Sequence, residues 1–285
     1  MSIKPGEARL IKAALIYLGV IVVAVAMILP FYWAVLVSFK QESGISTTRL
    51  VLFDFRHLTL ENYLYALKYF GIGLYFKNSA IIIAIGILFQ VAVSALAAYP
   101  LGRMGFRGKN VLIASFLATM MITDEMTAIP LYLVVTNVPF LHINLGNTYA
   151  GVILPAIPWG FLIFMLTRFF AEIPKEMEEA AVIDGCSVLG VFGRIILPLS
   201  KPVLGSVLVF SFLNFWDQFL IPLIVVNTRD LMPLTLGLRI MLSAEQTFYG
   251  NFMSATVIAT LPAVIVFLYA QRYFIAGIAT GALKG

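Results

Sequence analysis

Residues 178–202 read EEAAVIDGCSVLGVFGRIILPLSKP and lie between two long apolar segments, although they are rich in charge and in helix breakers. Just upstream, Pro174 can take the first position of a helix, where its missing N–H costs no hydrogen bond. Glutamates at positions 176, 178 and 179 then fall in the first turns, where negative charge suits the helix dipole. Such a helix is too short and too charged to span a bilayer.

A bend and a second short helix are predicted downstream. Gly185 can adopt a left-handed conformation and end the first helix. Ser187 can cap the second helix, which is expected to stop before Pro198 because proline disrupts a helix interior. Ala180 and Ala181 are small, so another surface could approach the backbone of the first helix closely.

The spacing in this stretch follows a long and strict signature, EAA-x3-G-x9-I-x-LP. Its fixed positions are Glu179-Ala180-Ala181, Gly185, Ile195 and Leu197-Pro198. The stretch resembles the signature of the membrane subunits of binding-protein-dependent ABC importers. The flanking segments IPKEMEEAAVIDG, IPLY, WDQFLIPL and QRYFIAGIATGALKG are similar to the carbohydrate-uptake branch, the maltose and glycerol-phosphate type permeases. The resemblance covers most of residues 75–285.

This resemblance implies an all-α, type I ABC importer permease fold with six transmembrane helices in a bacterial or archaeal cytoplasmic membrane. It implies a transport subunit rather than an enzyme, with ATP and Mg²⁺ bound by a separate ABC ATPase dimer and no cofactor bound by this chain. The other implied partners are an extracytoplasmic solute-binding protein, a carbohydrate substrate and a second permease, either a related chain or a second copy. The residues implied to couple to the ATPase are Glu179, Ala180, Ala181, Asp184, Gly185, Ile195, Leu197 and Pro198.

The composition independently places most of the chain in a membrane. Of 285 residues, 61% are hydrophobic and only 12% are charged, whereas soluble proteins average about 25% charged residues. The single cysteine, Cys186, excludes a disulfide within the chain. The net charge of +5 reports membrane orientation rather than nucleic-acid binding.

Six apolar segments are long enough to span a bilayer, which takes about 20 residues. They are Ala13–Val37, Ser79–Leu101, Val111–Leu133, Tyr149–Phe170, Pro202–Val226 and Phe252–Tyr273. The first is part of an uncharged run of 27 residues between Lys12 and Lys40. A signal peptide has an apolar core of only about 7–15 residues, so this run is interpreted as a retained span.

The positive charges orient these spans. Twelve of the 19 Lys and Arg residues fall at the two ends of the chain and in the second and fourth loops. Both termini and the loop 171–201 are therefore expected in the cytoplasm. Residues 1–12 form a cytoplasmic segment, and residues 13–285 form the permease domain. The outer segments 38–78 and 227–251 are either plain connections or, as the resemblance implies, a docking surface for the solute-binding protein.

Groups for catalysis or nucleotide binding are missing from the sequence. His57 and His142 are the only histidines, and their positions do not follow a metal-ligand spacing. The dipeptide Gly108-Lys109 lacks the preceding glycine of a phosphate-binding loop, because Arg103 stands there. Any ATP hydrolysis that drives this protein is therefore expected on another subunit.

Acidic residues within predicted spans are the second candidate site. Asp124 lies roughly 21 Å, and Asp217 roughly 22 Å, from the cytoplasmic ends of their spans at 1.5 Å per residue. Intramembrane acids are costly and usually face a cavity or a partner. Carboxylates and amides can hydrogen-bond sugar hydroxyls, and an aromatic ring can pack on a sugar. The hypothesis is a translocation path lined by Asp124, Asn214, Trp216, Asp217 and Gln218; anchoring of helix ends or interhelical hydrogen bonding is the alternative.

Two other classes of protein remain as alternatives. An ion-coupled secondary transporter would use Asp124, Glu125 and Asp217, but this reading leaves the spacing of the EAA stretch and its two short cytoplasmic helices unexplained. A membrane scaffold without transport activity is disfavoured by acids at membrane depth and by prolines within the spans. Dependence of uptake on a separate ATPase would distinguish the importer from both.

Overall fold

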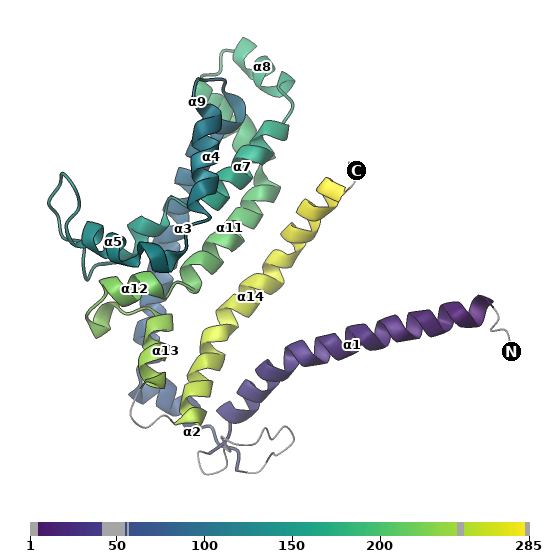
Figure 1. Cartoon of the computed structure of the whole chain (residues 1–285), viewed down its shortest axis with the longest axis vertical. Helices are drawn as coiled ribbons and strands as arrows, with labels where there is room; N and C mark the ends of the chain where they lie inside the picture. Colours follow the sequence, from purple (N-terminus) through teal and green to yellow (C-terminus); the bar gives the residue numbers. More distant parts are fainter. Residues whose placement is uncertain (1–4, 42–54, 56, 244–247, 283–285) are drawn as a thin grey trace. The chain divides into compact units, whose positions relative to one another are not determined.

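A computed structural model describes residues 5–41, 55, 57–243 and 248–282, and these residues form helices and connecting loops without a β-strand (Figure 1). The helices are α1 (Pro5–Ser38), α2 (Glu61–Leu64), η2 (Tyr65–Tyr69), α3 (Ile72–Arg103), α4 (Lys109–Thr119), α5 (Asp124–Thr136), α6 (Tyr149–Ile153), η3 (Leu154–Ala156), α7 (Gly160–Glu172), α8 (Glu176–Ile183), α9 (Val188–Val191), η4 (Phe192–Ile196), α10 (Leu197–Leu199), α11 (Lys201–Trp216), α12 (Leu220–Val225), η5 (Arg229–Leu231), α13 (Leu234–Leu242) and α14 (Tyr249–Ala282).

The chain divides into two units, of which the first contains Met1–Ile72 and Ile240–Thr260. Within it, the buried amide of Asn62 donates to the carbonyls of Ser38 and Lys40 at 2.9 and 2.8 Å. The hydroxyl of Ser254 donates to the Asn62 carbonyl at 2.9 Å. Asn62 therefore joins the end of α1 to the first turns of α14.

The second unit, Gly73–Arg239 and Leu261–Gly285, holds two clusters of buried apolar side chains. The first cluster contains Ala95, Ala98, Tyr99, Leu162, Leu166, Phe170, Ile173, Ala181, Val191, Phe192, Ile196 and Val207. The second contains Ile82, Ile83, Val135, Val152, Ile153, Ile157, Phe215, Val225, Val226 and Leu236. Because α3 and α11 each contribute to both clusters, these two helices connect the two parts of the core.

The number of spans agrees with the sequence only if bent helix pairs are counted. Three helices are long and apolar enough to cross a membrane: Lys12–Ser38, Ile72–Arg103 and Tyr249–Gln271. Three pairs qualify jointly but are bent, by 104° between α4 and α5, by 43° before α7, and by 82° between the α9–α10 segment and α11. The described residues therefore have three to six spans, and the predicted number of six is reached only when each bent pair counts as one span.

The predicted span Pro202–Val226 breaks after Trp216, where α11 ends, and resumes as α12. Pro222 cannot donate to the carbonyl four residues earlier, that of Gln218, and its ring would clash there. That carbonyl instead accepts from the Thr235 hydroxyl at 2.8 Å. The break therefore leaves no lost hydrogen bond at the Gln218 carbonyl.

The predicted span Val111–Leu133 breaks between Thr119 and Asp124. Asp124 and Glu125 lie in the first turn of α5, where the positive end of the helix dipole favours carboxylates. Both side chains are exposed within this chain. The bend in the chain and the two acids therefore occur together at the start of α5.

The predicted span Tyr149–Phe170 breaks at residues 157–159, and a side chain from another helix compensates for the break. The Ala156 carbonyl leaves the regular helical hydrogen-bond ladder and accepts from Nε2 of Gln90 at 2.6 Å. Gln90 lies on α3 and is fully buried. Broken helices at membrane depth need such internal partners, because lipid supplies none.

A buried asparagine connects α3 to the segment that precedes α13. The Asn78 amide donates to the carbonyls of Asp230 and Met232 at 2.8 and 2.9 Å, and its oxygen accepts from the Tyr149 hydroxyl at 2.7 Å. Its side-chain amide nitrogen and oxygen thus connect α3 to two other segments of the same unit, the segment before α13 and α6. No other side chain of similar size offers both donors and an acceptor in this arrangement.

We expect Asn78→Ala to lower the thermal stability of the purified protein, because it leaves buried carbonyls unsatisfied at about 1–3 kcal/mol each. Thermal unfolding in detergent measures the effect. The neighbouring exposed Lys77 provides a control, since Lys77→Ala removes no described contact. Equal melting temperatures for Asn78→Ala and the parent would show that these hydrogen bonds are dispensable.

Candidate functional site

The EAA stretch begins with the helix predicted for it. Helix α8 ends at Ile183, and Gly185, two residues later, has a φ of 82°, which is left-handed as predicted. The N–H of Cys186 donates to the Ala181 carbonyl at 2.9 Å, and the N–H of Gly185 donates to the Val182 carbonyl at 3.0 Å. These two bonds form a Schellman motif, which requires the left-handed residue that glycine adopts without strain.

The second short helix begins as predicted but ends later. The Ser187 hydroxyl accepts from the N–H of Gly190 at 3.2 Å and caps α9. The helical segment does not stop before Pro198, as the sequence predicted, but continues to Leu199. A π-helical turn over Phe192–Ile196 widens the helix just before the proline, with Leu197 N–H donating to the Phe192 carbonyl. The wider turn accommodates a residue that lacks an N–H.

One face of this loop is built into the core of the second unit. Ala181 is buried and belongs to the first cluster with Phe170 of α7 and Ile196. Ile195 and Leu197 are partly buried against the same cluster. The small side chain of Ala181 therefore allows α8 to approach its own chain, whereas Ala180 is exposed.

A buried arginine that the sequence analysis assigned no role at this loop ties it to two membrane helices. Arg103, the last residue of α3, pairs through Nε with the Glu178 carboxylate of α8. Its Nη1 donates to the carbonyls of Phe170 and Ile173 at 3.1 and 2.7 Å, at the end of α7. Its side chain is only 4% exposed. One guanidinium thus joins the ends of α3, α7 and the start of α8.

The other face of the loop exposes apolar side chains that nothing in the described chain covers. Ile183 is 85% and Leu189 73% exposed, and Met177, Val182 and Val188 are exposed as well. Glu179, Asp184 and Gly185 are exposed on the same loop. We call these residues the outer face of the EAA loop. A mixed apolar and acidic face on a rigidly anchored loop is suited to contact another protein.

The candidate path residues on α11 lie close together, but in different environments. Asn214 is partly buried, and its oxygen accepts from Gln90 Nε2 at 3.4 Å. The Trp216 ring stacks on Phe212 with centroids 5.4 Å apart. Asp217, which follows the last residue of α11, is exposed.

The remaining two candidates are less directly connected to this group. Gln218 is partly buried, and its Oε1 has no described hydrogen-bond partner. Asp124 is exposed at the start of α5. Among the described residues no hydrogen bond joins Asp124 to Asp217, so the structure does not assemble them into one carboxylate pair.

Sequence reasoning missed a polar seam between α3 and α11. Gln90 and Ser94, four residues apart on α3, and Ser211 on α11 are all fully buried. Gln90 Oε1 and the hydroxyls of both serines have no hydrogen-bond partner in the described part of the chain. The hydrogen bond from Gln90 to Asn214 shows that the two helices face each other here. Polar residues on one helical face within an apolar span were the signal available in the sequence.

Comparisons with known proteins agree with this architecture. The family model described as "Binding-protein-dependent transport system inner membrane component" matches residues 90–280. A probable ABC transporter permease protein, YurM of Bacillus subtilis, is 33% identical and covers 99% of this chain and 92% of its own. The arabinooligosaccharides transport system permease protein AraQ of Halalkalibacterium halodurans is 33% identical over 95% of this chain and 96% of its own.

An archaeal relative and a solved structure extend the comparison. The trehalose/maltose transport system permease protein MalG of Thermococcus litoralis is 30% identical over 97% of this chain and 99% of its own. The fold is similar to that of a chain in a bacterial ABC transporter involved in the import of the acidic polysaccharide alginate. That chain has a TM-score of 0.81 and 19% identity, with 96% of this chain and 99% of the other covered. This chain therefore belongs to the family of binding-protein-dependent transport system inner membrane components: it is a multi-pass permease subunit of an ABC importer, in the branch of the sugar permeases, and not an enzyme.

Proposed function

We propose that this permease couples to a separate ABC ATPase dimer through the outer face of the EAA loop. The observation that carries the proposal is the exposed apolar surface of Ile183 and Leu189 on a loop whose inner face is part of the core. Burial of such side chains in a partner's groove is favourable, and the exposed Glu179 and Asp184 can add polar contacts at its edge. ATP and Mg²⁺ are bound by the partner in this mechanism.

Arg103 gives the coupling a physical route. A displacement of α8 by the ATPase pulls on the Glu178 carboxylate, and the guanidinium transfers that displacement to the ends of α3 and α7. Breaking a buried ion pair by removing one partner is costly, so the three helix ends move together rather than separately. The bent membrane helices then change between inward and outward access.

The proposed substrate is a short oligosaccharide. The relatives' names support this class, since they transport arabinooligosaccharides and trehalose or maltose. Asn214, Trp216, Asp217, Gln218 and Asp124 are the proposed lining of the path, because amides, carboxylates and an indole ring suit sugar hydroxyls and ring faces.

The proposed assembly contains a second, related permease that completes the path, and an extracytoplasmic solute-binding protein that delivers the substrate. The distribution of Lys and Arg supports cytoplasmic termini and a cytoplasmic EAA loop.

The ATPase contact is tested by co-purification from membranes in mild detergent. We expect Ile183→Asp to weaken retention of the ATPase at least about 30-fold, because a central apolar contact in an interface contributes 2 kcal/mol or more. Gly185→Asp should also reduce it, since a non-glycine residue is strained at a φ of 82°. Lys175→Gln, an exposed change just before α8, is the control. Unchanged retention in Ile183→Asp would mean that the ATPase docks elsewhere.

The coupling route predicts a separation of ATP hydrolysis from uptake. In Arg103→Ala the ATPase should still co-purify, while sugar uptake falls more steeply than ATPase activity. Breaking the buried pair should cost about 3–5 kcal/mol, so amide hydrogen exchange in residues 176–183 should rise. Arg103→Lys keeps the charge but loses the forked set of N–H donors, so its sugar uptake should lie between those of the parent and Arg103→Ala. The exposed Arg107→Ala is the control. If Arg103→Ala lowered ATPase binding, ATP hydrolysis and sugar uptake to the same extent, Arg103 would be needed only for folding.

Sugar uptake into membrane vesicles tests both the energy source of transport and the proposed lining of the translocation path. Uptake should require internal ATP and persist when a protonophore and a sodium ionophore collapse the ion gradients. Asp217→Asn should raise the KM for sugar by up to about tenfold, the effect of one lost hydrogen bond, while ATP dependence stays. Asp230→Asn, an exposed change outside the path, is the control. Uptake that stops with the ion gradients and continues without ATP would favour the ion-coupled alternative.

A further inference from the structure

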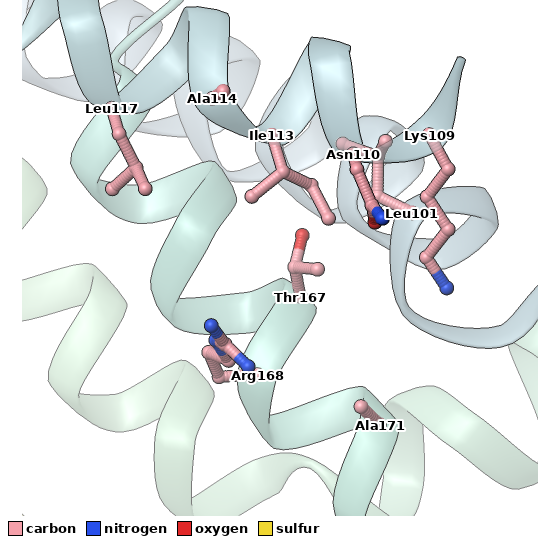
Figure 2. Close-up of a pocket in the computed structure, with 9 residues that line it drawn as sticks. All are labelled: Leu101, Lys109, Asn110, Ile113, Ala114, Leu117, Thr167, Arg168 and Ala171. Carbon is pink, nitrogen blue, oxygen red and sulfur yellow. The ribbon is translucent and has the colours of Figure 1, made fainter.

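A hollow of ≈ 410 Å³ lies between α4 and α7, at the ends of these helices nearest the EAA loop. Its size is within the range of about 300–1,000 Å³ typical of ligand sites. It is lined by Leu101, Lys109, Asn110, Ile113, Ala114, Leu117, Thr167, Arg168 and Ala171. Figure 2 shows Ile113 and Leu117 of α4 pointing toward α7, with the cations Lys109 and Arg168 on opposite sides of the hollow.

A close backbone contact between the two helices lies outside the lining of the hollow. At Gly160, the first residue of α7, an added Cβ would lie 2.7 Å from the Phe116 carbonyl of α4, so the backbones are in close contact there. The walls of the hollow carry the small side chains of Ala114 and Ala171. These methyl groups leave the space between the two helices unfilled.

The two ends of the groove differ in chemistry. Lys109 and Arg168 form no ion pair with a carboxylate in the described part of the chain, and no acid lines the groove. Lys109 Nζ donates only to the Met104 carbonyl at 3.3 Å, and the Arg168 guanidinium lies 5.1 Å from the Phe164 ring centroid. Thr167 is engaged with the Ile163 carbonyl. The free donors are therefore the two cations and the Asn110 amide.

The apolar part of the groove is long and is exposed within this chain. Leu117 lies about 12 Å along α4 from Lys109 at 1.5 Å per residue. Ala114 and Leu117 are exposed within this chain, as expected of a wall open to lipid. A second hollow of ≈ 330 Å³ shares Lys109 and Asn110 with the groove, and no acidic residue lines it. Its lining consists of Gly105, Phe106, Gly108, Lys109, Asn110 and Val111.

We propose that this groove binds one anionic phospholipid, with its phosphate between Lys109 and Arg168 and one acyl chain along Ile113 and Leu117. A soluble phosphate would satisfy the cations but leave the apolar wall open, and a neutral lipid would leave the two cations uncompensated. Pockets of basic residues between membrane helices on the cytoplasmic side bind the anionic headgroups of lipids. The position beside the EAA loop places the lipid next to α7, the helix whose end Arg103 holds.

The test uses the intact complex purified with its co-purifying subunits. Native mass spectrometry, after incubation with phosphatidylglycerol or phosphatidylcholine, counts the lipid retained. The parent complex should retain phosphatidylglycerol in preference. Since each cation contributes about fivefold to anionic-lipid binding, Lys109→Ala/Arg168→Ala should lower retention about 25-fold. Arg194→Ala/Lys201→Ala removes two exposed cations outside the groove and should leave retention unchanged.

Variants that fill the groove distinguish lipid binding at a formed site from nonspecific electrostatic attraction of the lipid. Ala114→Phe, or Ala171→Leu on the opposite wall, keeps both cations but occupies the acyl position, and either should abolish retention in a complex that stays intact on size exclusion. Added inorganic phosphate should not displace the lipid.

Three results would overturn the proposal. They are equal retention of both lipids, loss of lipid in the charge variant but not in the filled variants, and loss of the second permease from the filled variants, which would make the groove a protein interface. None of these readouts requires transport or ATPase coupling, so the proposal can fail while the proposed function stands.

Discussion

The structure around the EAA loop depends on one buried guanidinium. Arg103 must satisfy its charge and its donors within the protein, because its side chain is almost inaccessible. It does so with the Glu178 carboxylate and with the carbonyls of Phe170 and Ile173 at the end of α7. A last-turn arginine also suits the negative end of the α3 dipole. The position of α8 is therefore fixed by the need to neutralise a charge as well as by apolar contact.

The ion pair between Arg103 and Glu178 holds a loop whose inner face is already part of the hydrophobic core. Ala181 lies in the cluster formed by α3, α7 and α11, so α8 cannot slide without opening a cavity among well-packed side chains. Only the outer face, with Ile183 and Leu189, is left to a partner. A loop held by both packing and charge can transmit force, whereas a loosely attached loop of the same sequence would absorb it.

The membrane helices follow a second constraint, which is that every freed backbone group needs a partner inside the protein. At the two breaks, a polar side chain from another segment donates to the freed carbonyl: Gln90 to that of Ala156, and Thr235 to that of Gln218. Polar residues within apolar spans are thus partly structural. The seam that continues from Gln90 to Ser211 carries polar atoms beyond this requirement, which distinguishes it from a simple repair of broken helices.

Local chemistry in the sequence determined the membrane class, the family and the two-part EAA loop. The left-handed turn at Gly185 and the cap at Ser187 follow from a few neighbouring residues, so they could be predicted without the fold. Tertiary structure decided the rest, because it brings together residues far apart in the chain. The bond from Gln90 to Ala156, the pairing of Arg103 with Glu178, and the inward burial of Ala181 all depend on which helices become neighbours, and no local pattern encodes that choice.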